Sequence, residues 1–283
     1  MHACGHDVHM SSWWGTAAIM ARTKDNWHGT LMLIAQPAEE TISGAQKMIE
    51  DGLFTRFPKP DIGIALHDTN SMPVGQVGVT PEYAGANADS LRINVYGKGG
   101  HGAWPERTID PIVIAAAIVL RVQSIISREI QTGETAVIER IAKGEAEAGG
   151  AEKMPLIEKY ESTAAVYNDP VLTRHLAATL EAALGKDNVV VRPPAMGSED
   201  YSVFVEQGVP SFYFTLGVAD PEKLKQAKAV GKELPSLHSP LFAPVAEPSL
   251  RTGITAEVAV LRDLLKGSAA DVGKITEHKQ GGN

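Results

Sequence analysis

The chain has 283 residues, which is enough for about two domains of about 150 residues each. Hydrophobic residues make up 43% of it, charged residues 21%, and no apolar run approaches the roughly 18 residues of a membrane span, so we expect a soluble globular protein with no membrane partner. The formal net charge is −8 and Lys and Arg form no cluster, which argues against a nucleic-acid partner. A single cysteine and the absence of a signal-peptide pattern predict a reducing, cytoplasmic location.

The first part of the chain predicts alternating helices and strands. Asp7 can cap a helix over residues 8–22, and the apolar run at residues 29–36 has the length of a strand that is buried on both faces. A short helix and two further strands are expected at residues 43–51, 61–66 and 74–79. This order predicts an α/β layer.

A change of pattern after residue 88 predicts a second domain. Residues 89–95 alternate in polarity as a half-exposed strand does, and the glycine-rich turn 97–100 follows. Asp110 and Pro111 predict the start of a long helix. The elements expected next are helices at 111–131 and 134–148 and a strand at 154–161.

The α/β rhythm resumes after the helix-start signal Asn168-Asp169-Pro170. The elements expected there are a helix at 170–184, a strand at 189–191, a helix from 199, a strand at 210–216 and a helix at 248–265. The Gly-, Ser- and Lys-rich residues after 266 predict a disordered tail.

Several residues of the chain could bind a metal ion. Cys4 and His6 offer a thiolate and an imidazole just before a helix, whose N-terminal dipole favours anionic sulfur. Such a pair can bind a borderline-soft divalent ion, although a Cys-x-His pair taken alone is more often structural.

Two adjacent carboxylates, Glu39 and Glu40, follow the predicted strand at 29–36, at the end of a strand where α/β proteins tend to bind ligands. One could bind a metal and the other could act as a general base, but a solvated loop end would look the same. His67 follows another apolar run, and His238 lies in a later loop. Each of these histidines taken singly is more often a surface or core residue than a ligand.

Six segments together resemble the M20 metallopeptidases. They are MHACGHDVH, AQPAEET, IALHD, GKGGHGAWPERTIDPI, MGSEDYSVF and LHSPLF. The resemblance is to the amidohydrolase branch, which holds hippurate hydrolases, N-acyl-amino-acid amidohydrolases, indole-acetyl-amino-acid hydrolases and N-acetyl-diaminopimelate deacetylases. The resemblance implies a mixed-sheet α/β catalytic domain of the zinc-exopeptidase type with an inserted, incomplete ferredoxin-like α+β lid and dimerisation domain. It places the catalytic domain at 1–86 and 164–266, the lid at 87–163 and the tail at 267–283.

The resemblance also implies a mechanism. The metal ligands would be Cys4, His6, Glu40, His67 and His238, binding two divalent ions of zinc, manganese, cobalt or nickel. A metal-activated water would cleave the amide bond of an N-acyl amino acid or short peptide, with Glu39 as general base. His101 of the lid would steady the oxyanion, often across the interface of a homodimer. Glu199 and Asn168 are predicted to contact substrate, although helix capping alone explains a carboxylate at 199.

The sequence departs from the family pattern in three places. A segment that precedes HACGHD in relatives is not found, two blocks of the lid at 127–130 and 137–144 lie unusually close together, and Pro105-Glu106 replaces the usual Pro-His. These departures support a second hypothesis, a non-catalytic remnant that binds metal or a partner chain. A third, an aminopeptidase or carboxypeptidase, is disfavoured by Cys4.

Overall fold

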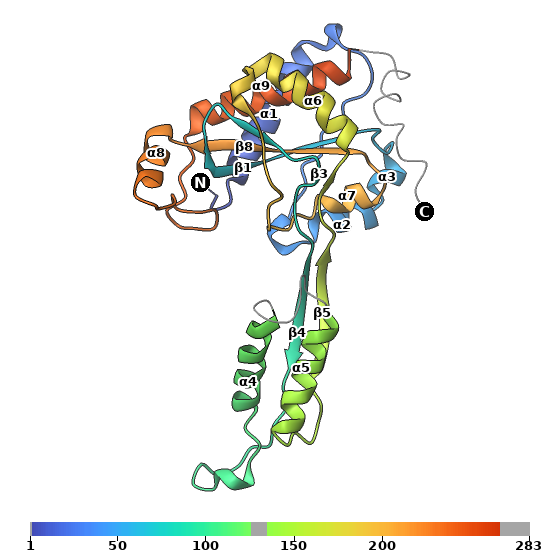
Figure 1. The fold of residues 1–283 in the computed structure, drawn as a ribbon. Coiled ribbons are helices and arrows are strands. Elements are labelled where there is room, and N and C mark those ends of the chain that lie inside the picture. The colour runs from blue at the N-terminus through green and yellow to red at the C-terminus, as the bar shows by residue number, and fades with distance from the viewer. Residues whose placement is uncertain (1, 126–134, 267–283) are drawn as a thin grey trace. The chain divides into compact units, whose positions relative to one another are not determined.

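The computed structural model describes residues 2–125 and 135–266 (Figure 1). The chain divides into two compact units, of which the second is Asp89–Ser162 and the first is the chain on either side of it. The predicted tail at 267–283 and the predicted helical residues 126–134 lie outside the described residues. Within the described ranges, no helix combines the length and the apolar character that a membrane crossing requires.

The first unit is built on a four-stranded mixed sheet in the order β1-β8-β2-β7. Its strands are β1 (Gly63–Pro73), β2 (Val77–Val79), β7 (Val189–Val191) and β8 (Ser211–Ala219). β8 runs parallel to β1 and antiparallel to β2, which is itself parallel to β7. A two-stranded sheet of β3 (Glu82–Tyr83) and β6 (Tyr167–Asn168) adjoins it. The mixed sheet agrees with the predicted α/β class.

Three helices cover one face of this sheet, as Figure 1 shows. They are α1 (His6–Arg22), α6 (Pro170–Leu184) and α9 (Ala246–Leu264). α9 packs against both α1 and α6, and all three contact the strands. The core between them is fully buried and includes Leu176, Leu180, Phe212, Leu216 and Val260. Burial of such side chains contributes about 1.5–3 kcal/mol each, so this layer holds β1 and β8 firmly in place.

A smaller cluster lies on the opposite side of the sheet in Figure 1. It joins α2 (Gly44–Glu50), α3 (Leu53–Arg56) and α7 (Ser202–Glu206), whose buried side chains include Ala45, Leu53, Val203 and Phe204. α7 begins later than the helix predicted from residue 199. The cluster packs α2 and α3 against α7.

One predicted strand is wrong. Residues 29–36 form no strand, and Leu33 in the middle of the run is 41% exposed rather than buried. A strand needs hydrogen bonds to a neighbour, and within the described residues this segment pairs with no strand of the sheet. β1 is also longer than the predicted strand at 61–66, and His67 lies inside it, opposite Thr215.

The helix ends differ from expectation at α1 and α8. The N-cap of α1 is Gly5 and not Asp7, whose carboxylate instead accepts a hydrogen bond from the backbone of His2 at 3.1 Å. α8 (Pro221–Ala229) was not predicted, although Asp220 caps it by accepting from the backbone N–H of Glu222 at 2.9 Å.

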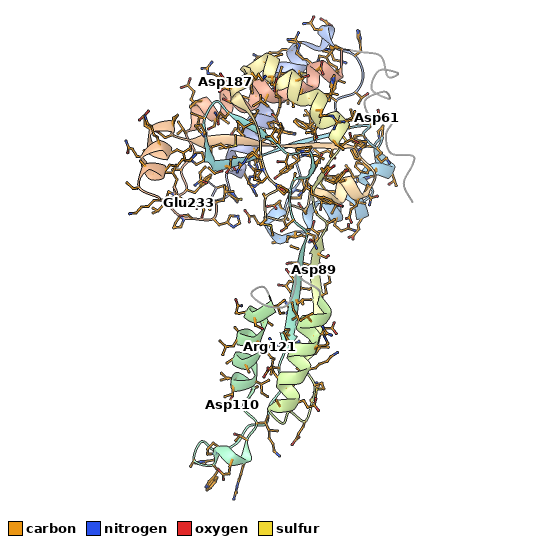
Figure 2. The ribbon with its side chains drawn as sticks, viewed as in Figure 1. Asp61, Asp89, Asp110, Arg121, Asp187 and Glu233 are labelled. Carbon is orange, nitrogen blue, oxygen red and sulfur yellow. The ribbon has the colours of Figure 1, made fainter. Side chains whose placement is uncertain are left out.

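Within its described part, the second unit, Asp89–Ser162, contains two α-helices, a 3-10 helix at Pro105–Arg107 and a two-stranded sheet. The strands are β4 (Ala88–Asn94) and β5 (Leu156–Thr163), and the helices are α4 (Pro111–Ser124) and α5 (Thr135–Ala148). Asp110, labelled in Figure 2, caps α4 by accepting from the backbone N–H of Ile112 at 2.8 Å. The two helices pack through buried side chains that include Ile114, Ile118, Ile141 and Ala146.

Candidate metal centre

The first pair of predicted ligands lies on a tight turn at the start of α1. Gly5, between Cys4 and His6, has a φ of 70°, in the left-handed region that favours glycine. A Cβ atom at this position would lie 2.1 Å from Oδ2 of Asp68, so the turn packs directly on that carboxylate. Cys4 is 5% exposed, which keeps its thiol away from bulk solvent.

Glu39 and Glu40 lie on a strained turn. They begin a 3-10 turn, Glu39–Thr41, between Ala38 at φ 55° and Ile42 at φ 48°. A non-glycine residue in this region costs about 1–3 kcal/mol and is typical of functional sites. The strain is therefore consistent with a turn shaped for its carboxylates rather than for stability.

A third carboxylate, Asp200, anchors that turn and was not predicted from the sequence. Asp200 is 1% exposed and accepts hydrogen bonds from the backbone N–H of Ala45, at 3.0 Å, and from the side-chain amide of Gln36. These two donors lie on either side of Glu39 and Glu40. Asp200 thereby fixes both ends of the segment that carries them.

His67 and His238 approach from opposite ends of the chain. His67 lies inside β1, where pairing with β8 holds its backbone. His238 has a φ of 67°, and its backbone N–H donates to the carbonyl of Ala3 at 2.8 Å. This hydrogen bond brings the loop of His238 beside the turn that carries Cys4.

The five predicted ligands come together with Glu39. His67 Nε2 lies 3.6 Å from Cys4 Sγ, and His238 Nε2 lies 3.4 Å from Glu40 Oε2. His6 Nε2 lies 3.5 Å from Glu39 and 3.8 Å from Glu40. The donor atoms of Cys4, His6 and His67 lie within 4.8 Å of one another, as do those of Cys4, Glu40 and His238. One thiol, three imidazoles and a carboxylate in two overlapping groups fit a pair of borderline-soft divalent cations.

The electrostatics of the centre favour cation binding. Burial, reinforced by the neighbouring rings of His9 and His2, lowers the pKa of His6 from 6.5 to about 4. The ring is therefore neutral at pH 7, which is the form that binds metal. Burial, reinforced by the carboxylates of Glu199 and Glu40, raises the pKa of Glu39 from 4.5 to about 7. A group with such a pKa can accept and release a proton near neutral pH.

The pKa of His67 is shifted in the opposite direction to that of His6. Burial lowers the pKa of His67, but hydrogen bonds to Asp68 and to Cys4 outweigh it and hold that pKa well above 6.5. A cation must displace the proton on this ring. Metal binding is therefore expected to weaken as the pH falls.

Glu199 lies beside Glu39. Their carboxylates and that of Asp200 lie within 4.8 Å of one another. Glu199 accepts from the backbone N–H of Tyr201 at 3.2 Å and from the hydroxyl of Tyr213 at 3.4 Å. Burial raises the pKa of Glu199. Its position next to Glu39 is consistent with a supporting role at the site.

Asn168 and His101 are the two remaining predicted site residues. Asn168 is fully buried, and its amide donates to the carbonyls of Thr80 and Tyr213, both at 2.8 Å. Both amide hydrogens of Asn168 are therefore used in hydrogen bonds to the backbone, and its predicted substrate contact stays a prediction. His101 belongs to the second unit, where it is exposed and its ring centroid lies 4.9 Å from that of Trp104.

The chain is similar to curated proteins of known name. N-acetyldiaminopimelate deacetylase of Geobacillus thermodenitrificans is 34% identical over 272 residues, which cover 82% of this chain and 70% of the relative. IAA-amino acid hydrolase ILR1-like 4 of Arabidopsis thaliana is 28% identical over 97% of this chain and 69% of its own length.

Solved structures agree with these relatives. A putative aminohydrolase from methicillin-resistant Staphylococcus aureus superposes with a TM-score of 0.72 at 27% identity, covering 94% of this chain and 75% of that one. The YXEP protein of Bacillus subtilis, described as a dinuclear metal binding peptidase of family M20, superposes with a TM-score of 0.64 at 26% identity, over 92% and 73% of the two chains. The predicted mixed α/β fold class is confirmed. Residues 1–231 match the peptidase family M20/M25/M40, and the chain therefore belongs to this family of metal-dependent amide hydrolases.

Proposed function

We propose that the chain hydrolyses the amide bond of N-acyl amino acids, with two divalent metal ions held by Cys4, His6, Glu40, His67 and His238. The observation that carries the proposal is the convergence of these side chains from four separate segments, with Glu39 beside His6. Its relatives are named for the deacetylation of N-acetyldiaminopimelate and the hydrolysis of IAA-amino acid conjugates. Both names describe an acyl group on an amino acid.

The arrangement supplies a proton path. Metal ions in such a site polarise the amide carbonyl and lower the pKa of water. Glu39 takes a proton from the attacking water and delivers it to the leaving nitrogen, a transfer that suits a pKa of about 7. Burial raises the pKa of Glu39, and the neighbouring carboxylate of Glu199 raises it further. His101 is proposed to donate to the oxyanion that develops on the carbonyl.

Hydrolysis of N-acetyl and N-benzoyl amino acids, with manganese or zinc added, tests the proposal. Glu39→Gln removes the proton acceptor and is expected to lower kcat by about 10²–10⁴-fold while metal content is retained. Glu50→Gln, at an exposed position on α2, is the matched control and is expected to keep full activity. Equal hydrolysis rates for the unsubstituted chain and the Glu39→Gln variant would contradict the proposal.

The second unit is proposed to form a homodimer, as predicted. α4 exposes an apolar stripe in which Ile112, Val113, Val119 and Leu120 are between 61% and 76% exposed. Such a stripe on one helix is typical of a protein interface. Leu120→Glu is expected to give a monomer in light scattering, whereas Val191→Glu, at a comparably exposed apolar residue of the first unit, keeps the dimer. A monomeric unsubstituted chain contradicts this proposal.

A second candidate function is metal or partner binding without catalysis. The observation that favours it is the two-stranded sheet described for the second unit, which offers little surface to a substrate. A stable, metal-loaded protein that hydrolyses none of the tested amides would favour this function over the first. Metal analysis combined with the hydrolysis assay decides between them.

A further inference from the structure

A buried carboxylate lies directly behind the proposed metal ligands. Asp68 is 1% exposed, and its carboxylate oxygen Oδ1 lies 3.4 Å from Nδ1 of His67 and 3.0 Å from Nε2 of His9. The other oxygen, Oδ2, is buried and has no hydrogen-bond partner. A buried carboxylate with one unsatisfied oxygen is costly for stability, which calls for an explanation beyond packing.

The ring of His67 is held between this carboxylate and the ligand cluster. Its Nε2 lies 3.6 Å from the thiol of Cys4, while its Nδ1 donates to the backbone carbonyl of Asp68 at 2.8 Å and lies near the carboxylate. One nitrogen thus faces the other donors and the second faces Asp68. Metal-binding histidines usually present this pair of contacts, because a carboxylate or carbonyl on the far nitrogen fixes the ring and raises its basicity.

The same carboxylate also contacts the segment that carries Cys4 and His6. His9, one turn into α1, lies against Oδ1, and its Nε2 is also 3.0 Å from the backbone N of Asp68. Gly5 packs so closely that an added Cβ atom would lie 2.1 Å from Oδ2. Asp68 therefore touches the ligand-bearing part of β1 and the ligand-bearing turn of α1 at once.

We propose that Asp68 is a positioning residue, which orients His67 as a metal ligand and, through His9 and Gly5, sets the turn that carries Cys4 and His6 at the correct distance from it. The inference rests on the proposed metal centre. It does not require Asp68 to touch a metal ion or a substrate. The alternative is a purely structural ion pair between α1 and β1, which would affect folding and leave metal affinity unchanged.

Metal affinity, measured by competition with a chromophoric zinc chelator at pH 7, distinguishes a positioning role of Asp68 from a purely structural one. Asp68→Asn keeps the size of the side chain but removes its charge, and it is expected to weaken zinc binding by about 10–100-fold. Asp263→Asn is the matched control, because Asp263 also pairs with a histidine, His175, but this pair joins α6 to α9 away from the ligands. The control is expected to bind zinc as the unsubstituted chain does.

A second variant covers the case in which Asp68→Asn does not fold. His9→Gln removes one contact of the carboxylate from a half-buried position and is expected to weaken zinc binding about 10-fold. Folded variants that bind zinc as tightly as the unsubstituted chain would overturn the inference and leave the proposed function intact. An unsubstituted chain that binds no metal would overturn both.

Discussion

Glu257 on α9 provides a test of the fold that does not depend on activity. Its carboxylate lies between α9 and α1 and accepts a hydrogen bond from the hydroxyl of Thr16 at 2.6 Å. Burial raises the pKa of Glu257 from 4.5 to about 7, and the hydrogen bond from Thr16 offsets only part of that rise. The folded protein therefore binds a proton at Glu257 more tightly than the unfolded chain does.

The sign and size of the effect follow from this difference. Between pH 4.5 and about 7 the folded state holds more protons at Glu257 than the unfolded state, so the free energy of unfolding falls as the pH rises. At about 1.4 kcal/mol per pKa unit, the rise corresponds to a loss of up to about 3 kcal/mol above pH 7. Below pH 4.5 both states are protonated at Glu257 and this loss disappears.

Glu257→Gln removes the titration and keeps an acceptor for Thr16. Chemical denaturation at several pH values is expected to show the variant more stable than the unsubstituted chain by up to about 3 kcal/mol at pH 8, with the difference vanishing near pH 4. Glu247→Gln, on the same helix but with a side chain that is 83% exposed, is the control and should shift stability by less than about 0.5 kcal/mol. A difference that stays constant with pH would refute the reasoning.

Three further predictions concern the metal centre. Hydrolysis should rise with pH through about 7, because Glu39 must be deprotonated to act as a base; an unchanged pH–rate profile in Glu39→Gln would contradict this. His238→Ala should lower the number of metal ions bound per chain in elemental analysis, and an unchanged number would remove His238 from the ligands. Gly5→Ala should lower the free energy of unfolding by about 2 kcal/mol or more, because it forces a left-handed residue with a Cβ atom 2.1 Å from Asp68. Gly75 has a φ of 90°, and an added Cβ atom would meet nothing within 4 Å. Gly75→Ala therefore adds backbone strain without a clash and should lower the free energy of unfolding by less than Gly5→Ala.

Helix starts could be read from the sequence where a local signal was strong. Asp110-Pro111 and Asp169-Pro170 predicted helices, and both aspartates cap helices by accepting backbone N–H donors. The same signal, Asp220-Pro221, predicts no helix by itself, because the lysine-rich segment after it buries only Leu224 and so has no apolar stripe. Capping is a local interaction, so it can be predicted from neighbouring residues without knowledge of the fold.

Strands were harder to predict because their hydrogen bonds come from elsewhere in the chain. The apolar run at 29–36 has the composition of a buried strand and forms none. β1, in contrast, continues through the polar residues His67, Asp68 and Thr69 because β8 pairs with each of them. Pairing with a strand far away in sequence decided both cases.

The candidate site was also only partly predictable from the sequence. The ligands could be proposed from short motifs, because each motif keeps its residues in a recognisable local context. The supporting residues could not: Asp68 meets His9 across 59 positions and Asp200 meets Ala45 across 155. A histidine three positions after His6 and an aspartate directly after His67 are the only local signals that could have indicated the first pair.

The hydrogen bond between His238 and Ala3 has a consequence for the order of folding. It closes a loop that spans most of the chain, and closing so long a loop is entropically costly until the sheet and its helices are already in place. His238 lies in a loop and its side chain is 65% exposed, and such regions open locally more readily than strands in the core. The amide proton of His238 should therefore exchange with solvent sooner than those of β8. The complete set of proposed metal ligands is therefore expected to assemble only when folding is complete.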